Sequence, residues 1–156
     1  MWGIILCAAL GTVPCMDKGV AITESLVTRG LRIEVAAGFA GNFFVESRCL
    51  PKSNGPSGIG LAQWCGSRRN QLLTYAKSRG RPWWDLDVQL DFVILELSDL
   101  PLTHRDKILN SPSVELAATY ISIYYERPRK PNLRHRINAA KRIYSLMGEK
   151  YGIARR

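Results

Sequence analysis

The hydrophobic positions of this chain recur at the three- and four-residue intervals that are typical of amphipathic helices. The spacing predicts helices over residues 17–30, 32–47, 68–78, 88–98, 104–109, 111–125 and 133–147. The segment 88–98 is apolar on nearly every side, so we expect it to be the buried central helix. The sequence therefore predicts a mainly α protein.

Residues at the ends of these segments fit the positions of helix caps. Gly30 and Gly148 suit the left-handed residue that follows a helix and would stop the first and last helices. Ser67 is a suitable N-cap for the helix over 68–78, and Asp85 or Asp87 for the helix over 88–98.

Residues 50–66 are the region to which we expect any strands to be confined. Asn54-Gly55 is a turn signal, and Pro56 and further glycines follow it. We expect a loop or a small β-hairpin here. A glycine-rich segment of this kind lets a ligand approach the backbone closely.

Glu46 stands at the end of the helix over 32–47, and Pro51 prevents that helix from continuing. The negative end of a helix dipole and apolar surroundings both disfavour an ionised carboxylate, so the sequence predicts a raised pKa for Glu46. A raised pKa suits a general acid that works near neutral pH. The alternative is an ordinary solvated glutamate at a helix end.

The 156 residues suffice for one domain, and 22 Lys and Arg against 13 Asp and Glu give a formal charge of +9. Such a charge attracts polyanions, which include nucleic acid, anionic lipid and bacterial cell wall.

Cys49 and Cys65 flank the glycine-rich loop. We expect free thiols in a protein made in a reducing cytosol, and a disulfide between Cys49 and Cys65 is the alternative. Cysteine and histidine spacing does not favour a metal site.

Residues 1–13 are nearly uncharged and are too short for a helix that spans a bilayer. They either pack on the domain, act as a weak export or anchor segment, or dock into a partner protein; burial by packing or docking is favoured. We therefore divide the chain into an apolar N-terminal segment, 1–16, and a catalytic domain, 17–156.

Several ordered motifs resemble those of the phage tail lysozyme family, within the wider lysozyme and lytic transglycosylase group. They are GNFFVES (41–47), GIGLAQWCGSRR (58–69), Trp84-Asp85-Leu86, QLDFVILEL (89–97) and Tyr125-Glu126-Arg127-Pro128, so the resemblance covers residues 18–146. It implies a lysozyme-like domain in which a small β element around residues 50–66 forms one wall of the sugar cleft.

The resemblance implies a bacteriolytic glycosidase that cleaves the MurNAc–GlcNAc bond of peptidoglycan without cofactor or metal. Glu46 matches the family's general acid/base. Substrate contacts are implied for Ser47, Gly60, Leu61, Gln63, Trp64, Tyr124 and Glu126. Glycosidases use a second carboxylate as base or nucleophile, yet no Asp or Glu follows Glu46 before Asp85. The reaction is therefore that of a single-glutamate lytic transglycosylase or of an inverting lysozyme, and Glu126 is either a second acid or an ion-pair partner of Arg127 or another basic neighbour.

The resemblance also implies a bacteriophage protein, made in the host cytoplasm, that acts as a tail component of the virion or at the cell wall or periplasm. Its expected partners are glycan strands and, through the apolar N-terminus, tail or other virion proteins. No specific nucleic acid is expected, since no helix-turn-helix or zinc-finger spacing is present. The alternative is a non-enzymatic virion structural or nucleic-acid-binding protein with a lysozyme-like fold, whose binding to DNA would fall steeply with salt.

Overall fold

A computed structural model describes residues 14–152, and this part of the chain is mainly helical, as the hydrophobic spacing predicts. The α-helices are α1 (Pro14–Thr28), α2 (Ile33–Ser47), α3 (Gly66–Ser78), α4 (Leu86–Asp99), α5 (Leu102–Leu109), α6 (Val114–Tyr120) and α7 (Leu133–Tyr151). A π-helix, η1 (Ile121–Glu126), follows α6 directly, and a hairpin of β1 (Asn54–Gly55) and β2 (Gly58–Ile59) precedes α3. Residues 1–13, to which the expectation of packing or docking applies, lie outside the described part.

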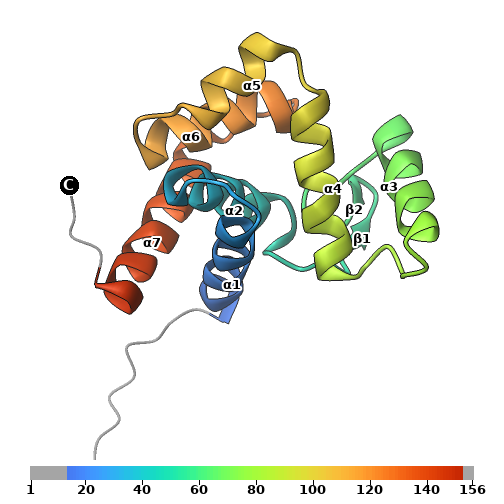
Figure 1. Cartoon of the computed structure of the whole chain (residues 1–156), viewed down its shortest axis with the longest axis horizontal. Helices are drawn as coiled ribbons and strands as arrows, with labels where there is room; N and C mark the ends of the chain where they lie inside the picture. The colour runs from blue at the N-terminus through green and yellow to red at the C-terminus, as the bar shows by residue number, and fades with distance from the viewer. Residues whose placement is uncertain (1–13, 153–156) are drawn as a thin grey trace, which may run out of the picture.

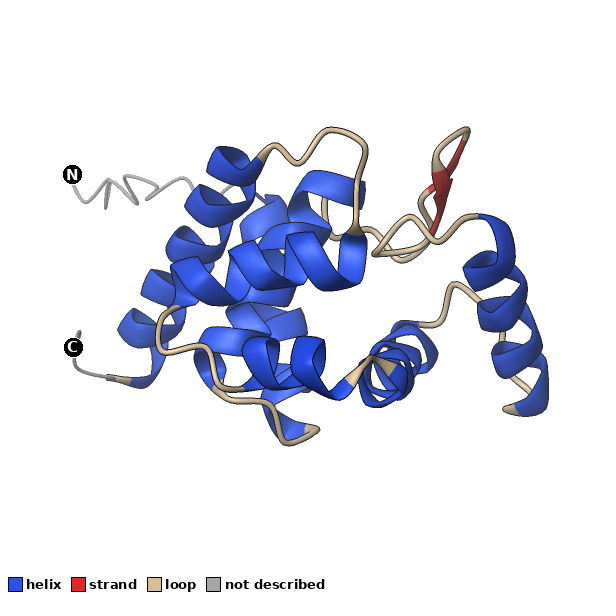
Figure 2. Cartoon of the chain, turned by 90° about the horizontal axis from the view of Figure 1, so that it is seen from above, coloured by secondary structure: helices blue, strands red, loops and turns tan. Residues whose placement is uncertain are grey.

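The centre of the molecule is α2, whose residues 35–43 are all buried. It packs against α1, α6 and α7, while α3 and the hairpin lie on the far side of α4 (Figure 1). Figure 2 shows the same division from above, with the two short strands apart from the main group of helices. The prediction that 88–98 is the central helix is therefore wrong: α4 buries one face, but its Leu95 is 43% exposed.

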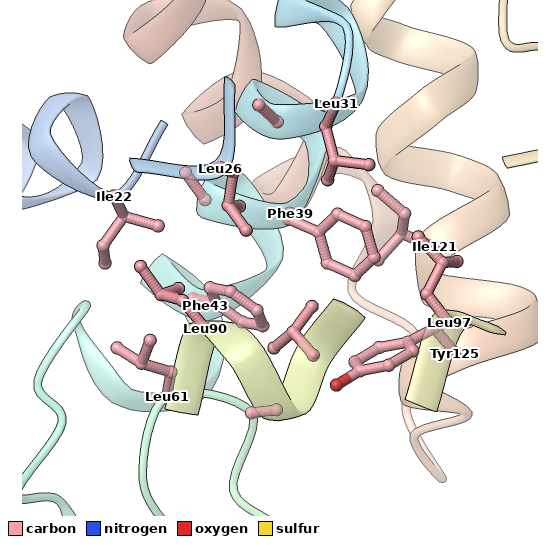
Figure 3. Packing of buried hydrophobic residues seen from close by; sticks show 14 of the residues in the cluster. Ile22, Leu26, Leu31, Phe39, Phe43, Leu61, Leu90, Leu97, Ile121 and Tyr125 are labelled. Carbon is pink, nitrogen blue, oxygen red and sulfur yellow. The ribbon is translucent and has the colours of Figure 1, made fainter. Parts of the chain in front are cut away.

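Phe39 and Phe43 of α2 form the middle of the hydrophobic core, where they meet Leu90 of α4 and Tyr125 of η1 (Figure 3). The rings of Phe39 and Tyr125 meet edge to face, with centroids 5.1 Å apart. Aromatic pairs favour this geometry because the positive ring edge faces the negative ring face. Through it the end of η1 is fixed against the centre of α2.

Small residues bring α2 unusually close to its neighbours. A Cβ on Gly41 would lie 2.6 Å from both the backbone nitrogen and the Cβ of Ala140 on α7. A Cβ on Gly38 would lie 2.9 Å from the Cβ of Ala117 on α6. The helix that ends at Glu46 is thus held at near-contact distance from both α6 and α7.

The hairpin lies where strands were expected, but its turn does not. Asn54 pairs with Ile59 and Gly55 with Gly58, so the Asn54-Gly55 dipeptide forms β1 and the turn consists of Pro56 and Ser57. Trp64 then pairs with Ile59 through two backbone hydrogen bonds. The turn signal predicted the right region but the wrong register. The pairing of Ile59 with Trp64 also fixes which residues of β1 and β2 face each other.

Several helix ends also differ from the prediction. Asp85 caps α4 as expected, because its carboxylate accepts a hydrogen bond from the Val88 N–H. The N-cap of α3 is Cys65 rather than Ser67. Gly148 lies inside α7, and the C-cap of that helix is Gly152, which is in the left-handed conformation.

Within the described residues Cys15, Cys49 and Cys65 are free, so Cys49 and Cys65 are not bonded to each other. Burial raises the pKa of the Cys49 thiol to about 12. None of the helices that the structure describes is both long enough and apolar enough to span a bilayer.

Candidate active site

Glu46 is the penultimate residue of α2, and its side chain is 18% exposed. Arg48 and Cys49 both adopt the left-handed conformation immediately after it, and the Arg48 N–H caps the helix through the carbonyls of Phe43 and Phe44. The helix end therefore presents Glu46 at a sharp turn of the chain, as the sequence predicts.

The Glu46 carboxylate is held by a buried arginine. Arg136 of α7 is 2% exposed, and its Nη2 donates to Glu46 Oε1 at 2.7 Å. The same guanidinium donates to Asn42 Oδ1 at 3.1 Å and to the Pro131 carbonyl at 2.7 Å. The apolar surroundings expected for Glu46 are thus replaced, on one side, by a fixed positive charge.

The sequence does indicate that Arg136 is buried, although the helix prediction for residues 133–147 did not use this pattern. The buried face of α7 consists of Arg136, Ala139, Ala140, Ile143 and Met147, which recur at helical intervals. Arg136 therefore occupies a core-facing position among the exposed basic residues at the start of this helix. A charged residue at such a position requires a buried partner, and Glu46 is that partner.

Glu126 lies beside this ion pair at the last position of η1. As a residue it is half-buried, but its Oε1 is fully enclosed and has no hydrogen-bond partner. Burial raises the pKa of the Glu126 carboxyl well above its usual range, and the negative charge of Glu46 raises it further. The positive charges of Arg68 and Arg136 oppose this shift without cancelling it. The protonated form of Glu126 is therefore favoured to higher pH than in an ordinary glutamate.

The ion pair that the sequence suggested between Glu126 and Arg127 is not formed in the described part of the chain. Arg127 adopts the left-handed conformation at the end of η1, with φ of 52°, and is exposed. Its backbone N–H closes the π-helix by donating to the Ser122 carbonyl at 2.8 Å. The side chains of Glu126 and Arg127 thus point into different environments.

A second, largely buried ion pair, Arg68 with Glu96, also acts electrostatically on Glu126. Glu96 of α4 accepts hydrogen bonds from Arg68 Nε at 2.6 Å and Nη2 at 2.8 Å, from the Tyr125 hydroxyl at 2.6 Å and from Trp64 Nε1 at 2.8 Å. Arg68 also donates to the Tyr125 carbonyl at 3.2 Å. Neither Arg68 nor Glu96 was identified as a site residue from the sequence.

The glycine-rich loop is attached to the end of α2 and to α4 by buried polar groups. Ser47 Oγ donates to the Leu61 carbonyl at 2.9 Å. Gln89 of α4 is fully buried; its Oε1 accepts from the Leu61 N–H at 2.9 Å, and its Nε2 donates to the carbonyls of Pro51 and Trp83 at 2.8 and 2.9 Å. The predicted site residues Ser47 and Leu61 thus meet each other and join the loop to the helix that carries Glu46.

The remaining predicted loop residues differ in how far their side chains are available. Gly60 is in the left-handed conformation, and a Cβ there would lie 2.8 Å from Gln89 Oε1. Gln63 is half-buried, and its amide donates to Ser53 Oγ at 2.9 Å and to the Gly60 carbonyl at 3.0 Å. Trp64 is 0% exposed, so its ring is a core element that supports the loop from below.

Tyr124 belongs to a different group of side chains. Its ring stacks on His104 of α5, with centroids 4.4 Å apart, and its hydroxyl accepts a hydrogen bond from Lys107 Nζ at 3.0 Å. These contacts connect Tyr124 to α5, whereas the neighbouring Tyr125 and Glu126 connect to α4 and to the charges around Glu46.

The sequence profile of the phage tail lysozyme family matches residues 18–147, which is most of the chain. The chain belongs to this family. A phage tail lysozyme degrades peptidoglycan, so the family supplies the class of substrate and indicates an association with the virion tail. Among residues 14–152 there is no group of three or more His, Cys, Asp and Glu side chains that suits a metal ion.

Proposed function

We propose that this phage tail lysozyme cleaves the MurNAc–GlcNAc bond of peptidoglycan with Glu46 as its general acid/base. The observation that carries the proposal is the placement of Glu46 at the exposed end of the central helix, beside the glycine-rich loop and a second carboxyl group. Family membership supports the substrate class. A general acid must reach the leaving oxygen from a fixed position, and Arg136 fixes the carboxyl by its 2.7 Å hydrogen bond.

The enclosed, unpartnered Oε1 of Glu126 favours a mechanism with a single acting glutamate. An inverting hydrolase needs an ionised carboxylate as base on the far side of the sugar, and burial, which raises the pKa of Glu126, makes this carboxyl less suited to that task. We therefore propose the lytic transglycosylase reaction: Glu46 protonates the bridging oxygen and then accepts the proton of the muramic acid 6-hydroxyl as that oxygen attacks the anomeric carbon. The product carries a 1,6-anhydro ring.

We propose that the loop over residues 58–64 forms the adjoining wall of the sugar cleft. Its backbone is held by Ser47 and Gln89, which keeps Gly60 and Leu61 at a constant distance from Glu46. The half-buried Gln63 amide is the side chain of this loop best suited to bind a sugar hydroxyl or acetamido group. Trp64 then supports the wall instead of stacking on the sugar, and Tyr124 contributes through its position on η1.

The virion tail is the proposed location, with the cell wall as the place of action. The formal charge of +9 suits an anionic wall, because long-range attraction increases the rate of encounter. Tail proteins are proposed partners for the apolar residues 1–16.

Release of soluble muropeptides from purified cell walls tests the proposal. We expect the wild type to release products with anhydro ends, and Glu46→Gln to be at least about 100-fold slower. Glu34→Gln, at the other end of the same helix and paired with Arg32, serves as the matched control and should retain activity. Undiminished cleavage by Glu46→Gln would reject the assignment, and reducing ends would favour hydrolysis. Salt-sensitive DNA binding without wall cleavage would support the non-enzymatic alternative.

A further inference from the structure

Glu126 Oε1 is enclosed and accepts no hydrogen bond, unlike the carboxylates of Glu46 and Glu96. Glu46 and Glu96 each have an arginine within hydrogen-bond distance, but Glu126 Oε1 has no donor, although it is shielded from solvent. A buried carboxylate in this position would be left with an unsatisfied negative charge, whereas a protonated carboxyl avoids it. The enclosure of Glu126 Oε1 without a donor therefore favours the protonated form of this carboxyl.

The charges that face Glu126 come from every element packed around it. They are Glu46 from α2, Arg68 from α3, Glu96 from α4 and Arg136 from α7, and the buried Tyr125 precedes it on η1. The group thus contains two arginines and, with Glu126 itself, three glutamates. With Glu126 protonated the positive and negative charges of this group are equal, and with Glu126 ionised there is one negative charge in excess.

Two neighbouring carboxylates repel each other when both are ionised, so such a pair retains one proton more readily than an isolated carboxyl group does. Here their surroundings are unequal, because Arg136 donates a hydrogen bond to Glu46, while burial favours the neutral form of Glu126. Such unequal pairs separate the group that stores a proton from the group that uses it.

We propose that Glu46 and Glu126 share a single proton, which rests on Glu126 and is transferred to Glu46 for cleavage of the glycosidic bond. This inference rests on the proposed function, because it gives the source of the proton that Glu46 donates. Of the two glutamates, Glu46 contacts the substrate, and Glu126 acts through Glu46.

The two glutamates hold the same number of protons before and after one turnover. Glu126 loses its proton and becomes a carboxylate as Glu46 gains the proton and becomes a carboxylic acid. Glu46 then gives the proton to the bridging oxygen, and the bond from the anomeric carbon to that oxygen breaks. The 6-hydroxyl oxygen bonds to the anomeric carbon and releases its proton to Glu46, from which it returns to Glu126.

The pH dependence of the reaction separates this role from a structural one. The wild-type rate should stay level across neutral pH, since Glu126 supplies the proton. In Glu126→Gln the proton must come from solvent, so the rate should fall about tenfold per pH unit as pH rises. Glu115→Gln is the matched control, because Glu115 lies on the preceding helix and pairs with Lys141 at the surface. A Glu126→Gln profile parallel to the wild type would overturn the proposal.

A titration followed by NMR of the ¹³C-labelled glutamate carboxyls tests the shared proton without any assay of activity. We expect one glutamate of the wild type to stay protonated at neutral pH, to disappear from the spectrum in Glu126→Gln, and to have a lower pKa in Glu46→Gln. The shared proton would be disproved if Glu126 had an ordinary glutamate pKa in the wild type, or if Glu46→Gln left the pKa of Glu126 unchanged. Absence of wall cleavage by the wild type would instead remove the proposed function and leave the titration result standing.

Discussion

Arg136 and Glu46 are 90 positions apart in the sequence, and their side chains meet at 2.7 Å between α7 and α2. The arginine is nearly inaccessible to solvent, and the glutamate is the partner that reaches the surface. Because Arg136 also binds Asn42 and the Pro131 carbonyl, one guanidinium connects the segment before α7 to the end of the central helix. The orientation of Glu46 is thus set by the packing of α7 on α2.

Removing the Arg136 guanidinium should destabilise the protein. In Arg136→Met the Glu46 carboxylate and Asn42 Oδ1 lose their donor, and we expect the free energy of unfolding to fall by about 3 kcal/mol. Urea unfolding followed by circular dichroism measures the change. Lys141→Met removes an exposed pair with Glu115 and should cost less than about 1 kcal/mol. Equal effects of the two substitutions would show that the Arg136 pair is not the stronger one.

Gln89 should be needed for the loop to remain in place. Gln89→Ala leaves the Leu61 N–H and the carbonyls of Pro51 and Trp83 without partners, so we expect a loss of about 2 kcal/mol or more. Hydrogen exchange of the Leu61 amide should accelerate before the rest of the protein opens. Gln71→Ala, on the exposed face of α3, is the control and should change neither quantity. Slow exchange in Gln89→Ala would mean that other contacts hold the loop.

The close contact between α2 and α7 predicts that Gly41 does not tolerate a side chain. Gly41→Ala should cost about 2 kcal/mol, and adding Ala140→Gly should not restore stability, because the Ala140 nitrogen also lies 2.6 Å from the new Cβ. Gly19→Ala is the informative comparison. Its Cβ would meet the Ile143 Cδ1 atom, so Ile143→Val should relieve the clash. Thermal unfolding of the four variants gives the answer, and recovery by Ala140→Gly would contradict the backbone argument.

The raised pKa of Glu126 predicts a particular dependence of stability on pH. Between the ordinary carboxyl pKa of about 4.3 and the raised value in the folded state, the folded protein holds a proton that the unfolded chain releases. Glu126 therefore lowers the free energy of unfolding as pH rises, by at most about 1.4 kcal/mol per pH unit. Glu126→Gln lacks this effect, so its stability relative to the wild type should increase with pH. Urea unfolding at a series of pH values measures the difference, and a constant difference would count against a protonated Glu126.

The order of the helices, the region of the hairpin and the position of Glu46 at a helix end were determined by the sequence alone. These features are local: they follow from apolar spacing, from Pro51 and from glycines within a few residues of each element. The same local reasoning misplaced the hairpin turn and the end of α7. At the hairpin a contact beyond the turn itself, the pairing of Ile59 with Trp64, decided the outcome.

Only the tertiary structure decided how the chemical groups are distributed. Whether Trp64 faces a sugar or the core, which arginine binds Glu46, and whether Glu126 is paired or enclosed all depend on which helices pack together. The charge state of a carboxyl depends on burial and on charges from distant parts of the chain. For Glu126 those charges come from four different helices, a combination that no local pattern in the sequence contains.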